Sequence, residues 1–445
     1  MHKQNLQLSS HFGYKELFRF TLPAIMMLVF TSIYSVVDGF FVSNFVGKVP
    51  FAAINFVMPY LIILGCVGFM FGTGGGALIA KTLGEGDRKR ANELFSMIVY
   101  AGLLSGVVLA VVSLLLLRPI VTLMGAEGPL FENCIIYGNI ILAALPFFML
   151  QYEFQCLFAT AGKPTLGLSI TVAAGLTNMI LDAVFVAFFQ WGLVGAAAAT
   201  AASQAVGGII PLIYFARKNS SYLQLGRCCF SRSALLKACA NGSSELMSNI
   251  SSSVVSLLFN LQLMQYAGED GVAAYGVLMY VSMIFQSIFM GYAVGVAPTI
   301  GYQYGARNHR ELRSLRKKSF HLIGIFSVAM FLTGQLLCRP LAMIFVSYDA
   351  ALLEMTVHAF SIFSFSFLLS GIGIFGSAFF TALNDGLTSA LVSFLRILVF
   401  QCSAVLILPM FWKLDGIWMS VVVAEALAAI VTCGFLAMKQ KTYQY

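Results

Sequence analysis

The sequence predicts an all-α membrane protein with twelve transmembrane helices arranged as two pseudo-symmetric bundles of six. Composition, long apolar runs and an internal repeat lead to this prediction. Of the 445 residues, 59% are hydrophobic and 10% charged, with a mean hydropathy of +0.88. A soluble domain carries about a quarter charged residues. So few charges cannot cover a water-exposed surface of this size, and we expect the lipid bilayer to be the solvent.

Twelve apolar runs are long enough to cross a membrane, which takes about 20 residues in a helix. Those of the first half are 16–46, 52–81, 92–117, 132–159, 164–190 and 192–216. Those of the second half are 236–267, 272–304, 318–338, 351–382, 386–411 and 414–438. We therefore expect an N-terminal lobe over 1–216, a polar linker over 217–235 and a C-terminal lobe over 236–445.

The second half repeats the first at a constant offset of 221 residues. The pairs that carry this register are Arg118-Pro119 with Arg339-Pro340, Gly47 with Gly268, Gly84 with Gly305, and Trp191 with Trp412. Matches of Arg, Pro and Trp are uncommon by chance in apolar sequence. Two copies in the same orientation predict bundles related by an axis along the membrane normal, with the substrate path at their interface.

The basic residues predict the orientation. With the N-terminus placed inside, 21 of the 26 Lys and Arg fall in cytoplasmic segments. The outer loops hold only Lys48, Arg118, Arg339 and Lys413, and Arg396 lies within a span. Cytoplasmic loops of membrane proteins carry such an excess. We expect a multi-pass protein of the cell membrane with both termini in the cytoplasm.

Several classes of function are disfavoured. The net charge of +8 is spread over short loops, so nucleic acid is not an expected partner. The nine Cys show no metal-ligand spacing and no disulfide pattern, and no cofactor is expected. A membrane-embedded enzyme would need His paired with Asp or Ser at membrane depth, whereas the His lie in the tail, a basic loop or near span ends. A sensor or scaffold is equally disfavoured, because no soluble domain is attached.

The lobes differ in their polar residues. Asp38 aligns with Phe259, Asp182 with Ser403, and Asn178 has no polar counterpart. A charge inside a span costs roughly 2.5–3.5 kcal/mol on insertion scales and usually marks a functional position. Asn178 and Asp182 are four residues apart and share one helix face. Two facing carboxylates cannot easily both ionise, so this group is a candidate site for H⁺ or Na⁺. The alternative is a hydrogen bond between helices or a carboxylate at the membrane boundary.

Four further residues stand out within the spans. Pro23 lies in the same run as Asp38 and removes a backbone hydrogen bond, so it can seed a bend or occupy a first helical turn. Glu153 is a candidate acid in the substrate path, or an acid near the cytoplasmic end of its helix. Arg396 and Glu425 lie on neighbouring helices and are expected to form a structural ion pair. Glu245 falls near the start of its run, where we expect it to be solvated.

These features together resemble the multidrug and toxin extrusion (MATE) family of cation-coupled efflux antiporters, over almost the whole chain. The resemblance rests on the twelve spans, the repeat, Pro23 and Asp38, the Asn178–Asp182 pair, and the loops Gly84–Arg88 and Gly305–Asn308. It is strongest to the bacterial branch whose N-lobe carboxylates couple export to H⁺ or Na⁺. The acidic pair that sodium-coupled members place in helices 7 and 10 of the C-lobe has no full counterpart, which favours the N-lobe.

The resemblance implies a function and roles for residues. Asp38, Asn178 and Asp182 would form the coupling-ion site, Tyr137 and Thr200 would supply supporting hydroxyls, and Pro23 would be a hinge. The expected activity is export of amphipathic, cationic small molecules by alternating access, driven by H⁺ or Na⁺, in a monomer with no other metal. A flippase for lipid-linked or polysaccharide substrates is the alternative, and it would need several basic residues facing the cavity.

Overall fold

The computed structural model describes residues 8–347 and 349–445, and this part of the chain is helical without a strand. The elements of the first half are α1 (Tyr14–Phe45), α2 (Lys48–Met70), a π-helical turn η1 (Phe71–Gly75), α3 (Gly76–Gly84), α4 (Arg88–Leu123), α5 (Gly128–Thr160), α6 (Pro164–Asp182), a second π-helical segment η2 (Ala183–Phe188) and α7 (Gly192–Ala216). Residues 218–231 of the linker have no helical structure.

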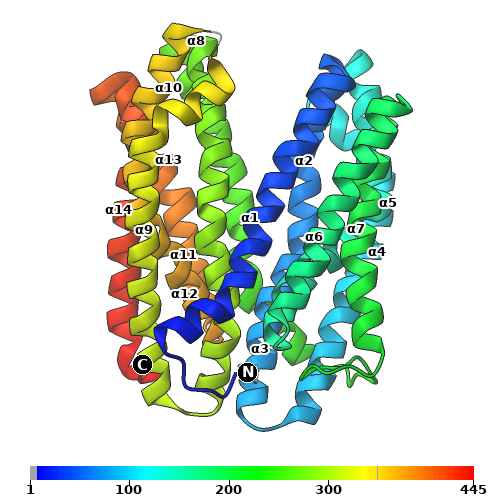
Figure 1. The fold of residues 1–445 in the computed structure, drawn as a ribbon, viewed down its shortest axis with the longest axis vertical. Helices are drawn as coiled ribbons and strands as arrows, with labels where there is room; N and C mark the ends of the chain where they lie inside the picture. The colour runs from blue at the N-terminus through cyan, green and yellow to red at the C-terminus, as the bar shows by residue number, and fades with distance from the viewer. Residues whose placement is uncertain (1–7, 348) are drawn as a thin grey trace.

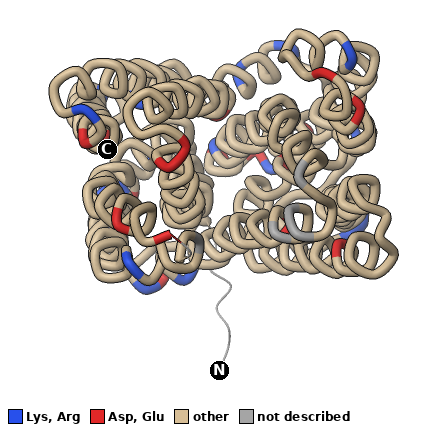
Figure 2. Tube along the Cα trace, turned by 90° about the horizontal axis from the view of Figure 1, so that it is seen from above, with Lys and Arg blue, Asp and Glu red and all other residues tan. Residues whose placement is uncertain are grey.

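The second half follows the same plan. Its elements are α8 (Arg232–Gly305), α9 (His309–Val346), α10 (Ala350–Phe363), a 3₁₀ turn η3 (Ser364–Ser366), α11 (Phe367–Ala382), α12 (Gly386–Phe394), a π-helical segment η4 (Leu395–Gln401), α13 (Cys402–Ile407) and α14 (Pro409–Tyr443). The helices form two bundles, α1–α7 and α8–α14, which converge where α1 begins and α14 ends and diverge at the other end (Figure 1). Figure 2 shows these two groups side by side.

The twelve predicted spans correspond to these helices within the described residues. Ten helices are long and apolar enough to cross a membrane when α8 is taken as one. The 74 residues of α8 contain a break at Gly268, whose φ of 62° is non-helical, so α8 holds two spans. The remaining span is α5, which is bent by 57° between Gly128–Ala143 and Leu145–Thr160. The prediction of a twelve-helix fold is confirmed.

The turns of the two halves share their backbone conformation at the offset of 221. Gly47 and Gly268 both have positive φ, and so do Gly86 and Arg307. After the second pair, Asp87 and Asn308 each cap the following helix, because their side chains accept a backbone N–H three residues on. A left-handed residue followed by a cap ends one helix and starts the next, so both halves turn alike at this loop.

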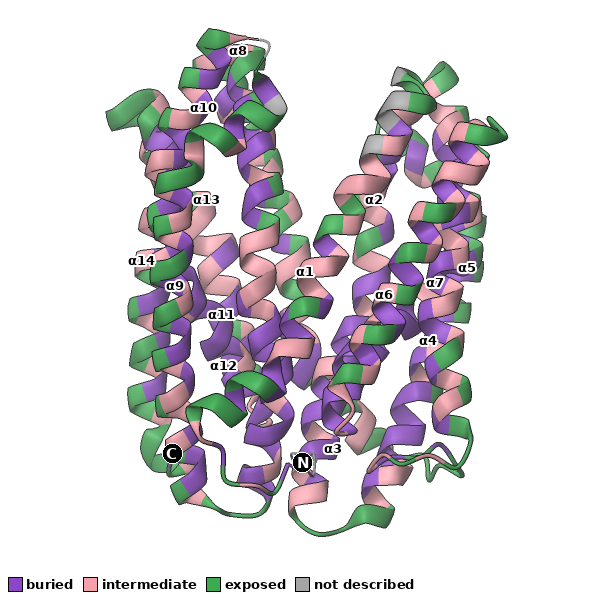
Figure 3. Cartoon of the chain, in the orientation of Figure 1, coloured by how far each residue is buried: buried purple, intermediate pink, exposed green. Residues whose placement is uncertain are grey.

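The sides of the bundles that face away from each other are apolar. Large side chains are exposed along the length of the helices, including Leu115 (76% exposed), Leu336 (76%) and Ile430 (68%). Figure 3 shows exposed and half-buried residues along the helices at the outer sides of both bundles. Exposed apolar surface of this extent is expected where lipid, and not water, is the neighbour.

Glycines allow the two bundles to come into close backbone contact at the narrow end of the molecule. A Cβ added to Gly84 would lie 2.0 Å from the carbonyl oxygen of Tyr302, and one added to Gly305 would lie 2.0 Å from that of Lys81. Both residues of the second contact are offset by 221 from those of the first. Small residues allow helix backbones to approach this closely. The contact between α3 and the end of α8 therefore obeys the pseudo-symmetry of the whole fold.

Candidate functional site: an acid cluster and a central cavity

The acid cluster of the N-lobe comprises Asp38 on α1 and Asn178 and Asp182 on α6. Asn178 Nδ2 donates to Asp38 Oδ1 over 3.5 Å. Asn178 and Asp182 are buried, with 1% and 0% of their surface exposed. The carboxyls of Asp38 and Asp182 face each other, and no other group forms a hydrogen bond with Asp182. An ionised carboxylate buried in this way is costly, so the cluster has unused capacity to bind a proton or a cation.

Helix geometry positions the cluster. Asp182 is the last α-helical residue of α6, and the π-helical segment η2 begins at the next residue. Segments of π-helix occur frequently at functional sites. The two predicted hydroxyls come from the other side: Tyr137 on α5 is buried and lies near both carboxyls, and Thr200 on α7 neighbours Asp38. The buried Oγ1 of Thr200 lies near the Asp38 carboxyl and the Tyr137 hydroxyl.

Pro23 lies well inside α1, nine residues beyond its start at Tyr14, and α1 runs through it as one helix. The position is therefore not a first helical turn. Close to it, α1 packs on the second half of α8, because a Cβ on Gly291 would meet the Cα of Ile25 at 2.5 Å.

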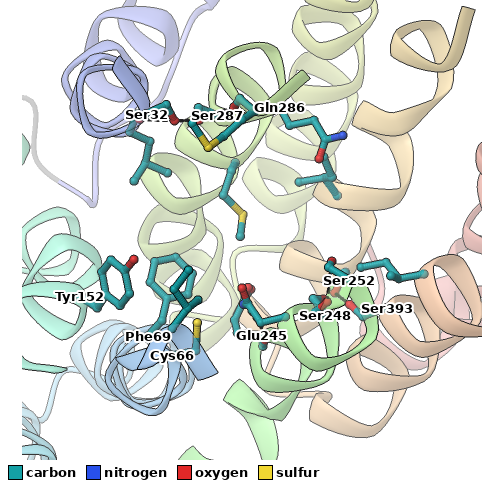
Figure 4. A pocket seen from close by; sticks show the side chains of 18 of the residues that line it. Ser32, Cys66, Phe69, Tyr152, Glu245, Ser248, Ser252, Gln286, Ser287 and Ser393 are labelled. Atoms are coloured by element: carbon teal, nitrogen blue, oxygen red, sulfur yellow. Dashed lines mark hydrogen bonds between the residues drawn. The ribbon is translucent and has the colours of Figure 1, made fainter. Parts of the chain in front are cut away.

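A cavity of about 390 Å³ lies between the two bundles. It is lined from the first half by α1, α2 and α5 and from the second by α8, α11, α12 and η4. Figure 4 shows hydroxyl, amide and carboxyl groups on its walls beside Phe69, Tyr152 and Cys66. The lining residues are Leu28, Thr31, Ser32, Ile62, Cys66, Phe69, Tyr152, Gln155, Glu245, Ser248, Asn249, Ser252, Met283, Gln286, Ser287, Met290, Ile374, Ser377, Ser393, Arg396 and Ile397.

Glu245 lines this cavity, contrary to the expectation that it would be solvated near the start of its span. It lies 13 residues beyond the start of α8 at Arg232. Ser248, Asn249 and Ser252 follow it on the cavity wall. This spacing of polar residues in an apolar span was the signal in the sequence, because residues three, four and seven apart share one face of a helix.

The structure joins Arg396 and Glu425 directly. Arg396 Nη2 lies 2.9 Å from Glu425 Oε1, and Arg396 Nε donates to both carboxylate oxygens over 3.1 and 3.0 Å. Gln401 Nε2 also donates to Glu425 over 3.4 Å. Glu425 is 1% exposed. Such a charge-assisted pair holds η4 against α14 and directs Arg396 along the cavity wall.

Glu153 is not among the residues that line the cavity. It is fully buried, and both of its carboxyl oxygens lack a partner. Its side chain occupies the space left by Gly102 of α4, because a Cβ there would lie 2.0 Å from Glu153 Oε2. The structure thus places this predicted candidate for the substrate path inside the first bundle, between α4 and α5.

Two bundles of membrane-spanning helices around a central cavity are the architecture of a multi-pass membrane transporter. A family model described as MatE matches the chain twice, at residues 23–184 and 246–406. The chain therefore belongs to the MatE family, a family of transporters and not of enzymes, as the resemblance in the sequence implied.

Relatives and solved structures agree with this assignment. The multidrug export protein MepA of Staphylococcus saprophyticus is 26% identical over 430 residues, which cover 96% of this chain and 92% of that protein. A crystal structure of MATE in complex with MaL6 is 22% identical, with a TM-score of 0.94 over the whole of both chains. An outward-facing multidrug resistance MATE family transporter is 23% identical, with a TM-score of 0.93 over 100% of this chain and 99% of that one.

Proposed function

We propose that this protein is a cation-coupled antiporter that exports amphipathic, cationic small molecules, with H⁺ or Na⁺ as the driving ion. The observation that carries the proposal is the acid cluster of Asp38, Asn178 and Asp182, in which Asn178 donates to Asp38 and the buried Asp182 has no partner other than the neighbouring carboxyl of Asp38. Membership of the MatE family and similarity to proteins named for multidrug export support the substrate class.

In this mechanism the acid cluster alternates between an empty state and a state that holds a proton or a Na⁺. When the cluster is empty, repulsion between the two carboxylates and the lack of hydration disfavour the ionised pair. A proton or a Na⁺ relieves this, the latter through carboxylate and amide oxygens. Asp38 lies on α1 six residues after Ser32, which lines the cavity, so about 9 Å of one helix separates them at 1.5 Å per residue. Ion binding and substrate binding thus act on the same helix.

Alternating access follows from the contact between the bundles. Glycine contacts close the end of the molecule that holds the start of α1 and the end of α14, and the bundles diverge at the other end. With cytoplasmic termini, as the basic loops favour, this arrangement is the state open to the outside. Entry of the cation would favour release of substrate there, and rocking of the bundles would carry the cation inward.

The cavity does not favour the flippase alternative. Phosphate groups call for several unpaired cations on the cavity wall. Among the described residues that line the cavity, Arg396 is the only Lys or Arg, and it is bound to Glu425.

Transport by proteoliposomes under an imposed pH or Na⁺ gradient tests the coupling. Asp38→Asn and Asp182→Asn should abolish gradient-driven accumulation of a cationic dye while leaving the fold intact. Asp270→Asn is the matched control, because it makes the same change at an exposed position of α8. If both cluster variants still accumulate the dye at the wild-type rate, the acid cluster is not the coupling site.

A further inference from the structure

The hydroxyl groups of the cavity wall on α8 act as hydrogen-bond acceptors. Ser248 Oγ donates to the carbonyl of Ser244 and Ser252 Oγ to that of Ser248, both over 2.8 Å. A hydroxyl has one hydrogen and two lone pairs. Because each hydrogen is bound one helical turn back, the oxygen that remains for a ligand in the cavity can only accept.

The opposite wall repeats this arrangement. Thr31 Oγ1 donates to the carbonyl of Met27 over 2.9 Å. Ser32 Oγ lies 2.5 Å from Ser287 Oγ, and these two hydroxyls also contact the carbonyls of Leu28 and Met283, so the pair consumes both of its hydrogens. These side chains belong to α1 and to the second half of α8, on two different bundles, and all of them line the cavity.

The other polar side chains of the cavity add both acceptors and donors. Glu245 adds a carboxylate, which accepts only. Arg396 spends its Nε and one terminal nitrogen on Glu425, and Gln286 spends an amide hydrogen on Ser282. Donor hydrogens remain at the Tyr152 hydroxyl and the Gln155 amide on α5, at Nη1 of Arg396, and at one N–H each of Asn249 and Gln286. Among these groups, the Glu245 carboxylate and the row of hydroxyl oxygens on α1 and α8 can only accept hydrogen bonds from a ligand.

We propose that the cavity selects cations that carry several N–H donors, such as guanidinium and amidinium compounds, over fully alkylated cations. This inference rests on the proposed function and specifies its substrate class. A fully methylated cation would satisfy the charge of Glu245 but would leave the acceptor oxygens unpaired, and sites built to hydrogen-bond a substrate reject analogues that lack the complementary group.

A pair of fluorescent probes tests this directly: an aryl-alkyl guanidinium and its permethylated derivative, which keeps the positive charge and has no N–H. Equilibrium binding of each probe to the purified protein is measured. We expect the guanidinium to bind at least tenfold more tightly, about the value of one hydrogen bond to a charged group. Equal affinities, tighter binding of the permethylated probe, or no binding of either overturns the inference.

Variants locate the effect on the cavity wall. Ser248→Ala combined with Ser252→Ala should weaken guanidinium binding about tenfold and leave the permethylated probe unchanged. Ser253→Ala is the matched control, since Ser253 makes the same bond to the carbonyl four residues back but does not line the cavity. If the control has the same effect as the double variant, the acceptor wall is not the cause.

Transport of the same probes by proteoliposomes separates the two proposals. Selective binding without gradient-driven transport would contradict cation-coupled export while supporting the acceptor wall. Gradient-driven transport of both probes with equal affinity would do the reverse.

Discussion

Replacing the glycines at the narrow end should shift the conformational equilibrium of the transporter. An added Cβ would lie 2.0 Å from a backbone oxygen at Gly84 and at Gly305, whereas ordinary contact begins at 3.4 Å, so α3 and α8 must separate by about 1.4 Å. Overpacking of this kind costs about 1–3 kcal/mol. The cost falls only on the conformation in which the bundles touch, so its population relative to the alternative state should drop about 5- to 150-fold.

Electron paramagnetic resonance between two spin labels can measure this shift. Lys89 and Arg310 are suitable sites, because both are exposed, lie in the first turns of α4 and α9, and are related by the offset of 221. For Gly84→Ala and Gly305→Ala we expect a new, longer distance between the labels. Gly434→Ala is the control, because a Cβ there meets nothing within 4 Å. Distance distributions equal to those of the control would refute the reasoning, provided thermal unfolding shows the variants folded.

Three further predictions concern stability, measured by thermal unfolding in detergent. Glu425→Gln should destabilise the protein by about 1.5–3 kcal/mol, because it removes the charged partner of the half-buried Arg396; an unchanged unfolding temperature would show that the pair is dispensable. Gly102→Ala should cost about 1–3 kcal/mol, because its Cβ would meet Glu153 Oε2 at 2.0 Å. Combining it with Glu153→Ala should cost less than the sum of the two single changes, and strict additivity would contradict the contact. Burial alone would raise the pKa of Asp385, but hydrogen bonds from Thr388 and Tyr443 outweigh it and hold the pKa below its ordinary value. Ionised Asp385 therefore stabilises the fold above its unfolded pKa, and this stabilisation is lost as the pH falls through the lower, folded pKa. The unfolding temperature of Asp385→Asn should consequently depend less on pH below about 4 than that of wild type; identical pH profiles would contradict this.

The spans and the turns between them could be predicted from local sequence. The expected run 192–216 coincides with α7, and the break expected between 267 and 272 occurs at Gly268. Turns are predictable because they depend on residues adjacent in the chain. The π-helical segment after Asp182 was not predicted, because hydropathy does not distinguish a π-helix from an α-helix.

The placement of acids was harder to predict than the helices that carry them. Glu245 was expected to be solvated because it lies near the start of its predicted span, and it lines the central cavity instead. The reason is that the partner bundle, and not the helix itself, decides which face of α8 meets water. For Glu153 the deciding residue is Gly102, some fifty positions away, whose missing side chain makes room for the carboxyl. Such pairings across helices have no local signature.

The position of α1 has a mechanical consequence. By sequence α1 belongs to the first half, yet it packs extensively on α8 of the second half as well as on α6. Gly291 and Gly295 of α8 leave room for the backbone of α1 around Thr21 and Ile25. A helix held from both sides must slide or part from one neighbour whenever the halves rotate. With the coupling role proposed for Asp38, binding of a proton or cation there would change which of the two halves α1 moves with.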